Sequence, residues 1–218
     1  MAATRRRVDQ SEETEPTGLG SRLRRERVRQ QIGLRELARR IGVSPSLISQ
    51  IETGKSDPSV STLSAIASEL DLSVNEILFD SGGPGTRRRA SISAAGDTGA
   101  GEPVQRADAR RSIHLETGVT WERLTAHADP EVDFLSVTYE PGGASTPSET
   151  LMRHSGTEYG VVLSGRLVLT IGFEDYELGP GDSISFPSTL PHRLANNGDE
   201  PVRAVWVVVG RHQDDREV

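Results

Sequence analysis

The sequence predicts a two-domain α + β chain, in which a small all-helical unit precedes an antiparallel β-barrel. Apolar residues recur at helical spacing between residues 19 and 80, whereas short β-like runs follow residue 112. A stretch rich in Gly, Ser and Arg separates the two patterns. Only 34% of the 218 residues are hydrophobic and the mean hydropathy is −0.45, which favours ordered units joined by solvated segments over one large core.

These patterns divide the chain into four segments. The first is polar, charged and aperiodic, which is typical of a disordered tail, and the third lacks large apolar residues, which is typical of a flexible linker. The predicted segments are the tail 1–17, the helical domain 18–80, the linker 81–111 and the β-domain 112–213.

The helical domain is expected to contain five helices. Ser44 can cap the third helix with its hydroxyl, and Pro45 fits the first helical position, where a missing N–H has no consequence. Gly42 and Gly54 stand where helices should end, and Ser59 can begin a later one.

The β-domain is expected to be a barrel or sandwich of short antiparallel strands. Turn signals such as Pro-Gly-Gly, Ser-Gly and Asn-Gly separate the runs. The candidate strands are Phe134–Tyr139, Glu158–Leu163, Arg166–Phe173, Ser183–Phe186 and Val202–Val209, with further leading strands expected within 112–129.

Charge is distributed unevenly, although the net charge is −7. Residues 19–55 carry nine Lys or Arg against three Glu, whereas residues 112–218 carry seven Arg against seventeen acidic residues. A local basic patch, rather than the total, governs contact with phosphates. The sequence has no Cys, which excludes disulfides and thiolate metal sites. It has no apolar run long enough to cross a membrane and no signal-peptide pattern, so we expect a cytoplasmic protein with no membrane partner.

The third predicted helix has an unusual outer face. Within GVSPSLISQIETGKSDPS, residues 42–59, Ile48 and Ile51 point to one side, and the remaining faces carry Ser, Gln and Thr. A solvated helix ordinarily has a charged outer face. A helix with small and amide side chains outward, preceded by an Arg-rich helix, suits the floor of a DNA major groove.

Residues 19–80 resemble the lambda-repressor-like (XRE) helix-turn-helix family. The similarity runs through LGSRLRRERVRQQIG, LRELARRIGVS, PSLISQIETGKSDPS and LSAIASELDLSVNEIL. In that family the third helix enters the major groove of double-stranded DNA, which implies that Pro45, Ser46, Ser49 and Gln50 face base edges. The Gln50 amide can donate and accept in one plane, as adenine requires. For Ser46 and Ser49, contact with phosphate is an equally open interpretation.

The same resemblance implies roles for five other residues. Arg35 opens the second helix near the DNA backbone, and Thr53 and Lys55 follow the recognition helix, so all three are candidate phosphate contacts. Arg27 matches a family arginine that pairs with the glutamate at the position of Glu52. We interpret this pair as a structural tie between the first and third helices.

The second half of the chain resembles the cupin family, which implies a jelly-roll barrel. The two characteristic motifs match PGGASTPSETLMRHSGTEYGVVLSGRL and GPGDSISFPSTLPHRLANNG. The residues that keep the motif spacing are His154, Glu158, Gly165, Gly181, Pro187, His192 and Asn196.

Cupins usually bind a divalent metal ion through three His and one Glu. Here Met152 stands at the first His position, and a thioether is a poor ligand for hard or borderline cations. His154, Glu158 and His192 remain. They either form a two-His, one-carboxylate metal site or line an effector pocket through hydrogen bonds alone, and no other cofactor is predicted.

The sequence therefore predicts a DNA-binding transcriptional regulator that reads an operator as a homodimer and senses a small molecule in its cupin domain. No catalytic residue is assigned and the protein is not expected to be an enzyme. Two alternatives stay open: a cupin metalloenzyme of the non-haem iron type that carries a helix-turn-helix head, and a regulator whose cupin is only a dimerisation scaffold.

Overall fold

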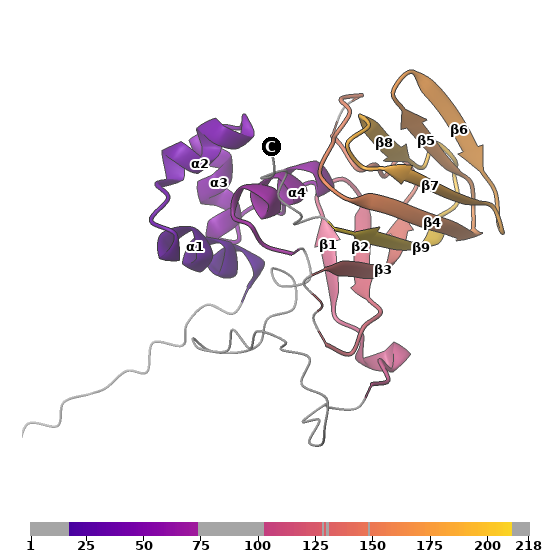
Figure 1. Ribbon diagram of the computed structural model, residues 1–218, viewed down its shortest axis with the longest axis horizontal. Helices are drawn as coiled ribbons and strands as arrows, with labels where there is room; N and C mark the ends of the chain where they lie inside the picture. Colours follow the sequence, from indigo (N-terminus) through magenta and orange to yellow (C-terminus); the bar gives the residue numbers. More distant parts are fainter. Residues whose placement is uncertain (1–17, 74–102, 128, 130, 148, 211–218) are drawn as a thin grey trace, which may run out of the picture.

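The structure is a computed structural model in which two modules lie side by side (Figure 1). We call residues 18–73 the helical module and the described residues between 112 and 210 the β-module. The residues that the structure describes are 18–73, 103–127, 129, 131–147 and 149–210.

The described part of the helical module contains four helices. They are α1 (Leu19–Arg29), α2 (Leu34–Ile41), α3 (Pro45–Glu52) and α4 (Val60–Glu69). The fifth helix that the sequence predicts would fall within residues 74–80, which lie outside the described residues. Four helices rather than five thus define the module.

Local sequence signals set the helix ends as expected. The Ser44 hydroxyl accepts a hydrogen bond from Leu47 N at the start of α3, and Ser59 caps α4 in the same way. Gly42 ends α2 with a φ of 74°, a left-handed conformation that favours glycine. These signals are local, and so they could be identified without knowledge of the fold.

A small apolar core and one buried ion pair hold the helical module together. Arg27 Nε donates to Glu52 Oε1 at 2.6 Å and Nη2 donates to Oε2 at 2.8 Å, so α1 and α3 are joined by a two-pronged contact. The hydrogen bonds that Arg27 donates to Glu52 raise the pKa of Arg27 despite its burial. The fully buried side chains around this pair are Leu23, Leu37, Ile48, Ile51, Leu63, Ile66 and Leu70.

The β-module consists of two antiparallel sheets. Its strands are β1 (Ser112–Leu115), β2 (Val119–Arg123), β3 (Val132–Tyr139), β4 (Thr157–Ser164), β5 (Leu167–Ile171), β6 (Glu174–Leu178), β7 (Ser183–Pro187), β8 (His192–Ala195) and β9 (Val202–Val209). One sheet has the order β1-β2-β3-β9-β4-β7 and the other the order β6-β5-β8. A short 3₁₀-helix, η1 (Ala107–Ala109), precedes β1. Apolar side chains from the facing sides of both sheets form the core.

The prediction of a closed barrel was wrong for the residues that the structure describes. No continuous ladder joins the two sheets there. The segment between β3 and β4 makes only isolated bridges to β8, at Ala144 and Met152. Pro147 lies between these bridges and has no N–H for a ladder, which accounts for the interruption.

Most predicted strands are present, with two differences. The run Arg166–Phe173 turns at Gly172, so β5 ends at Ile171 and its continuation becomes β6. The sequence analysis did not predict β6 or β8. β6 is almost wholly exposed and β8 is only four residues long, and so neither has a strong alternating pattern.

One close contact inside the large sheet depends on a glycine. A Cβ at Gly160 on β4 would lie 2.0 Å from Cζ3 of Trp206 on β9, so only glycine leaves room for the indole. The ring is thereby pressed onto the backbone of β4.

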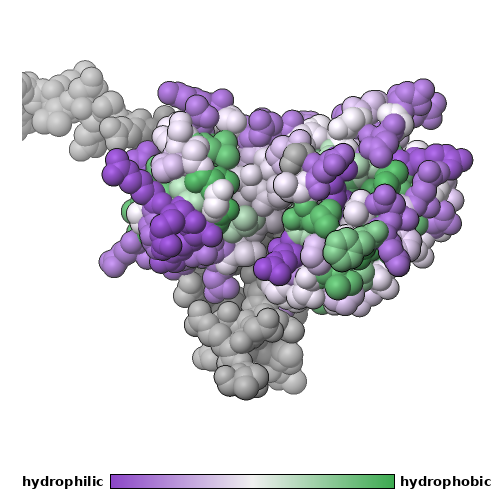
Figure 2. All heavy atoms as spheres, turned by 90° about the horizontal axis from the view of Figure 1, so that it is seen from above, coloured by the Kyte–Doolittle hydropathy of each residue, from purple (hydrophilic) through white to green (hydrophobic). Residues whose placement is uncertain are grey.

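Both modules have a mixed surface. On the side shown in Figure 2, hydrophilic side chains are prominent over both modules, and apolar side chains lie in patches among them. No helix among the described residues has the length and apolar character needed to cross a membrane.

The buried pair of the helical module gives a stability prediction. Glu52→Gln keeps the shape of the side chain but leaves the Arg27 charge buried without a counter-charge, so stability should fall by about 3 kcal/mol. Urea unfolding followed by helical circular dichroism measures this. Glu36→Gln is the matched control, because Glu36 makes the same two-pronged contact with Arg39 at the surface, where solvent screening should leave stability almost unchanged. An equal effect of the two substitutions would contradict the assignment.

Candidate functional site

Helix α3 presents one polar face to solvent. Pro45, Ser46, Ser49 and Gln50 are all exposed, whereas Ile48, Ile51 and Glu52 on the opposite side are buried. The structure thus brings the four residues with predicted base contacts onto one accessible surface. Whether they contact DNA stays a prediction.

The candidate phosphate contacts lie around this face. Arg35 on α2 and Lys55 after α3 are exposed. The Thr53 hydroxyl donates to the Ser49 carbonyl at 2.8 Å, so its hydrogen is already used at the end of α3. The two other arginines on α2, Arg39 and Arg40, both form ion pairs with Glu36. Less positive charge is therefore available to contact DNA than the charge count suggests.

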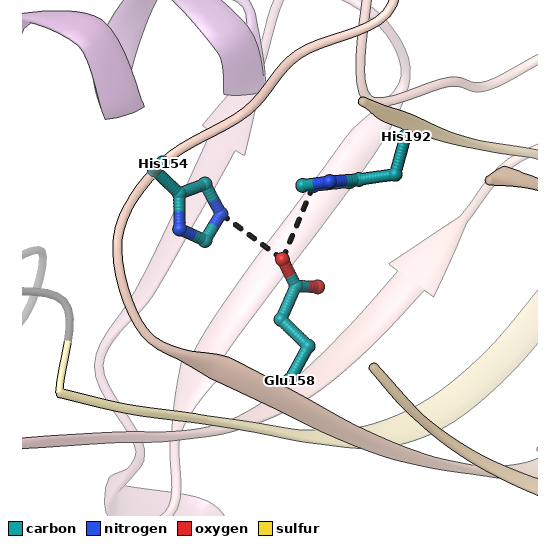
Figure 3. A group of neighbouring side chains, drawn as sticks. All are labelled: His154, Glu158 and His192. Carbon is teal, nitrogen blue, oxygen red and sulfur yellow. Dashed lines mark ion pairs between the residues drawn. The ribbon is translucent and has the colours of Figure 1, made fainter. Parts of the chain in front are cut away.

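A second site lies inside the β-module. His154 precedes β4, Glu158 is the second residue of β4, and His192 begins β8 (Figure 3). Both Nε2 atoms approach the same carboxylate oxygen, Glu158 Oε1, at 3.0 Å from His154 and 3.1 Å from His192. Glu158 and His192 are buried, with 3% and 1% of their surface exposed.

Hydrogen bonds on the far side of each group fix its orientation. The other oxygen of Glu158, Oε2, accepts from Trp206 Nε1 at 2.7 Å. His154 Nδ1 lies 2.9 Å from the Ser155 carbonyl, and His192 Nδ1 lies 2.8 Å from the Leu190 carbonyl. Carbonyl oxygens only accept, so each Nδ1 carries the hydrogen and, in a neutral ring, Nε2 is a lone pair facing Glu158.

In this arrangement one oxygen of Glu158, Oε1, lacks a hydrogen-bond donor. Oε1 is buried and has no well-aligned hydrogen bond, despite its short distances to the two rings. Burial raises the pKa of Glu158, whereas hydrogen bonds and positive charge from protonated His154 and His192 rings outweigh burial and hold that pKa below its usual range. An anion facing two lone pairs needs positive charge, either from protonated rings or from a cation.

The donor set fits a divalent cation. Two imidazole nitrogens and one carboxylate oxygen form a facial triad, and the three ligand atoms lie within 4.8 Å of one another. The two Nε2 atoms lie 3.0 Å and 3.1 Å from Glu158 Oε1, short enough for one ion to bind between them at ligand distances of about 2.1 Å. The Nδ1 and Trp206 hydrogen bonds are the outer contacts that orient metal ligands.

Met152 is close to this triad, as its sequence position suggested. Its N–H and carbonyl both pair with His192, at 2.8 Å each, and its side chain lines the same cavity. The bond from Trp206 to Glu158 was not predicted, because the sequence offers no signal for it.

The cavity around the triad holds about 30 Å³. Its walls come from β2, β3, β4, β8 and β9, and also from Val60 and Ser64 on α4. The contribution of the helical module was not predicted, because nothing in the sequence indicates how the two modules meet.

Comparisons with known proteins identify both domains. A family model for the helix-turn-helix matches residues 23–77, and one for the cupin domain matches residues 135–208. The HTH-type transcriptional regulator PuuR of Escherichia coli (strain K12) is 30% identical over 183 residues, which cover 82% of this chain and 89% of PuuR. The regulator SutR of the same organism is 25% identical over 177 residues, which cover 80% of this chain and 86% of SutR.

A solved structure shows the same fold. The crystal structure of an HTH_3 family transcriptional regulator from Vibrio cholerae superposes with a TM-score of 0.60 at 22% identity, and covers 88% of this chain and 94% of that one. Taken with the match to PuuR over most of both chains, the chain belongs to the family of HTH-type transcriptional regulators, with an XRE-type helix-turn-helix domain followed by a cupin domain.

Proposed function

We propose that this regulator binds a two-fold symmetric operator as a homodimer, with α3 in the major groove, and responds to a small polar effector in its cupin domain. The observation that carries the proposal is the polar, uncharged and fully exposed face of α3 above a buried apolar face. Because a transcriptional regulator must reach DNA, we assign this protein to the cytoplasm.

Base reading is assigned to Pro45, Ser46, Ser49 and Gln50. Gln50 is the residue suited to adenine, because its amide pairs with N6 and N7 in one plane. Arg35, Thr53 and Lys55 surround this face and are assigned to phosphates, which position the helix without reading sequence.

For the cupin domain we propose a divalent metal ion held by His154, Glu158 and His192, with Met152 beside it. The support is the convergence of two Nε2 lone pairs on an ionised, poorly satisfied carboxylate oxygen. A bound ion would offer open coordination positions to an oxygen- or nitrogen-bearing effector. The protein's part is to orient the three ligands and to keep the site away from bulk water.

Dimerisation is assigned to the outer face of the large sheet. Tyr159 and Val161 of β4 lie opposite Val207 and Val205 of β9, and together they line a shallow apolar depression. Tyr159 is 49% exposed, which is unusual for an aromatic side chain with apolar neighbours. A two-fold axis through this face would bury it against its own copy and place two heads for one operator.

We propose that the cupin domain is not catalytic. An enzyme would need the triad to turn over a substrate, so metal-loaded protein that consumed oxygen with a candidate substrate would favour the metalloenzyme alternative instead.

The operator proposal is tested by selecting bound fragments from sheared genomic DNA. Wild type should enrich a site with two half-sites roughly 34 Å apart, or a multiple of that distance. Gln50→Ala should lose about 1–3 kcal/mol of discrimination and keep weak, salt-sensitive binding. Lys55→Ala is the contrasting variant and should weaken all DNA alike, with a salt slope smaller by about 1. Enrichment of the same site by wild type and Gln50→Ala would sink the assignment of Gln50.

The metal proposal is tested by titrating Co²⁺ into chelator-treated protein. Glu158→Gln should abolish binding, and Trp206→Phe should weaken it by about 10–100-fold because the carboxylate loses its orienting bond. Glu140→Gln, at the exposed end of β3, is the control and should bind as wild type does. Unchanged Co²⁺ binding by Glu158→Gln would contradict the metal site and favour a pocket that holds its ligand by hydrogen bonds alone.

The dimer proposal is tested by light scattering. Val207→Glu places a charge in the centre of the apolar depression and should convert dimer to monomer at micromolar concentration. Tyr176→Glu on β6, which is similarly exposed but on the other sheet, should remain dimeric. A wild-type monomer, or a dimeric Val207→Glu, would show that this face is not the interface.

A further inference from the structure

Helix α4 of the helical module forms one wall of the cupin cavity. Val60 and Ser64 line that cavity together with the His154–Glu158–His192 triad, and they are 4% and 3% exposed. In Figure 3 the purple ribbon of the helical module lies beside the loop that carries His154. The wall is therefore built from both modules.

Backbone hydrogen bonds hold α4 in this place. The Ser61 N–H in the first turn of α4 donates to the Ser145 carbonyl at 3.0 Å. Just before the helix, the Pro58 carbonyl accepts from Glu116 N at 3.1 Å. These bonds tie the start of α4 to the β1–β2 turn and to the segment that follows β3.

The size of the cavity decides what it can hold while α4 is docked. A water molecule needs roughly 10–15 Å³ of accessible space, so the cavity of about 30 Å³ has room for an ion with one or two waters. A larger metabolite needs one wall to move. The other walls are strands held by ladders of hydrogen bonds, whereas α4 meets the β-module through the two backbone bonds above and the packing of Val60.

Ser64 is the polar side chain that α4 contributes to the cavity wall. Its Oγ is buried and has no hydrogen-bond partner, which is costly unless an occupant of the cavity provides one. A polar ligand that reaches the triad from the α4 side would pass this hydroxyl.

An adjoining groove offers the route. It holds about 240 Å³ and runs between the helical module and the segment before His154. Ser64 and Met152 line both the groove and the cavity, so these two side chains separate them. The groove also has Thr62, Thr150 and Arg153 on its walls, which suits a small polar or anionic molecule.

We propose that α4 is the movable wall of the effector pocket: a small polar ligand enters from the groove, hydrogen-bonds to Ser64, and displaces α4 from the β-module. That the ligand is an effector rests on the proposed function, whereas the coupling between the pocket and α4 does not depend on it. Because α4 packs against α2, and α2 against α3, displacement of α4 moves the DNA-reading surface as one unit.

The docking is tested with engineered cysteines in the full-length chain, which has no natural Cys. The pair Ser61→Cys and Ser145→Cys, whose backbones are hydrogen-bonded, should form a disulfide under mild oxidation. The pair Ser68→Cys and Ser145→Cys is the matched control, because Ser68 is on the exposed side of α4 and should not cross-link.

A second pair of engineered cysteines is used in case the first variant fails to fold. Ser145→Cys alters a hydroxyl that accepts from Leu194 N. The pair Pro58→Cys and Glu116→Cys spans the other backbone bond and serves the same purpose.

The gating is tested with diethyl pyrocarbonate, a reagent that modifies imidazoles and is much larger than the cavity. Labelling of His154 and His192, followed by mass spectrometry, should be at least about tenfold slower in the disulfide-locked form than in the reduced form. Exposed His127 should label equally in both and serves as the internal control. In partially labelled protein, modified His192 should be depleted from the fraction that cross-links.

The outcomes separate this proposal from the function proposed above. No cross-link at either pair, or equal labelling of the triad in locked and reduced forms, overturns the movable wall, whatever DNA the protein selects. Slower labelling in the locked form supports it even if no operator is found, because neither readout involves DNA or metal.

Discussion

The buried carboxylate of Glu158 is the constraint on which the interior of the β-module depends. A charge with 3% of its surface exposed needs partners of opposite character or well-aimed donors. Trp206 on β9 supplies one donor, and His154 and His192 approach from the loop before β4 and from β8. Satisfying one charge therefore positions strands from both sheets, and the contacts that organise the fold are the contacts that form the site.

Two glutamates, Glu52 and Glu158, are buried among the residues that the structure describes, and the contrast between them explains which one is available for binding. Glu52 receives two directed N–H groups from Arg27, so both of its oxygens are satisfied and the pair only holds α1 to α3. Glu158 receives one directed donor at Oε2, while Oε1 has no well-aligned donor from the two rings that it faces. A saturated pair stabilises a fold, and an unsaturated one is open to a ligand.

Features that depend on residues close together in the sequence could be predicted from it, and features that depend on distant segments could not. The Ser44 and Ser59 caps and the turn at Gly42 depend on neighbours a few residues away, and all could be identified. His154, Glu158 and His192 followed from a family motif rather than from physics.

The remainder depends on contacts between distant segments. The failure of the sheets to close, the Trp206 bond to Glu158 across 48 residues and the place of Ser64 in the cavity wall have no local signature. The chain's only two tryptophans, Trp121 and Trp206, both line that cavity. All indole emission of this protein therefore comes from the walls of its pocket, so the native chain carries its own optical reporter of occupancy, without any added dye.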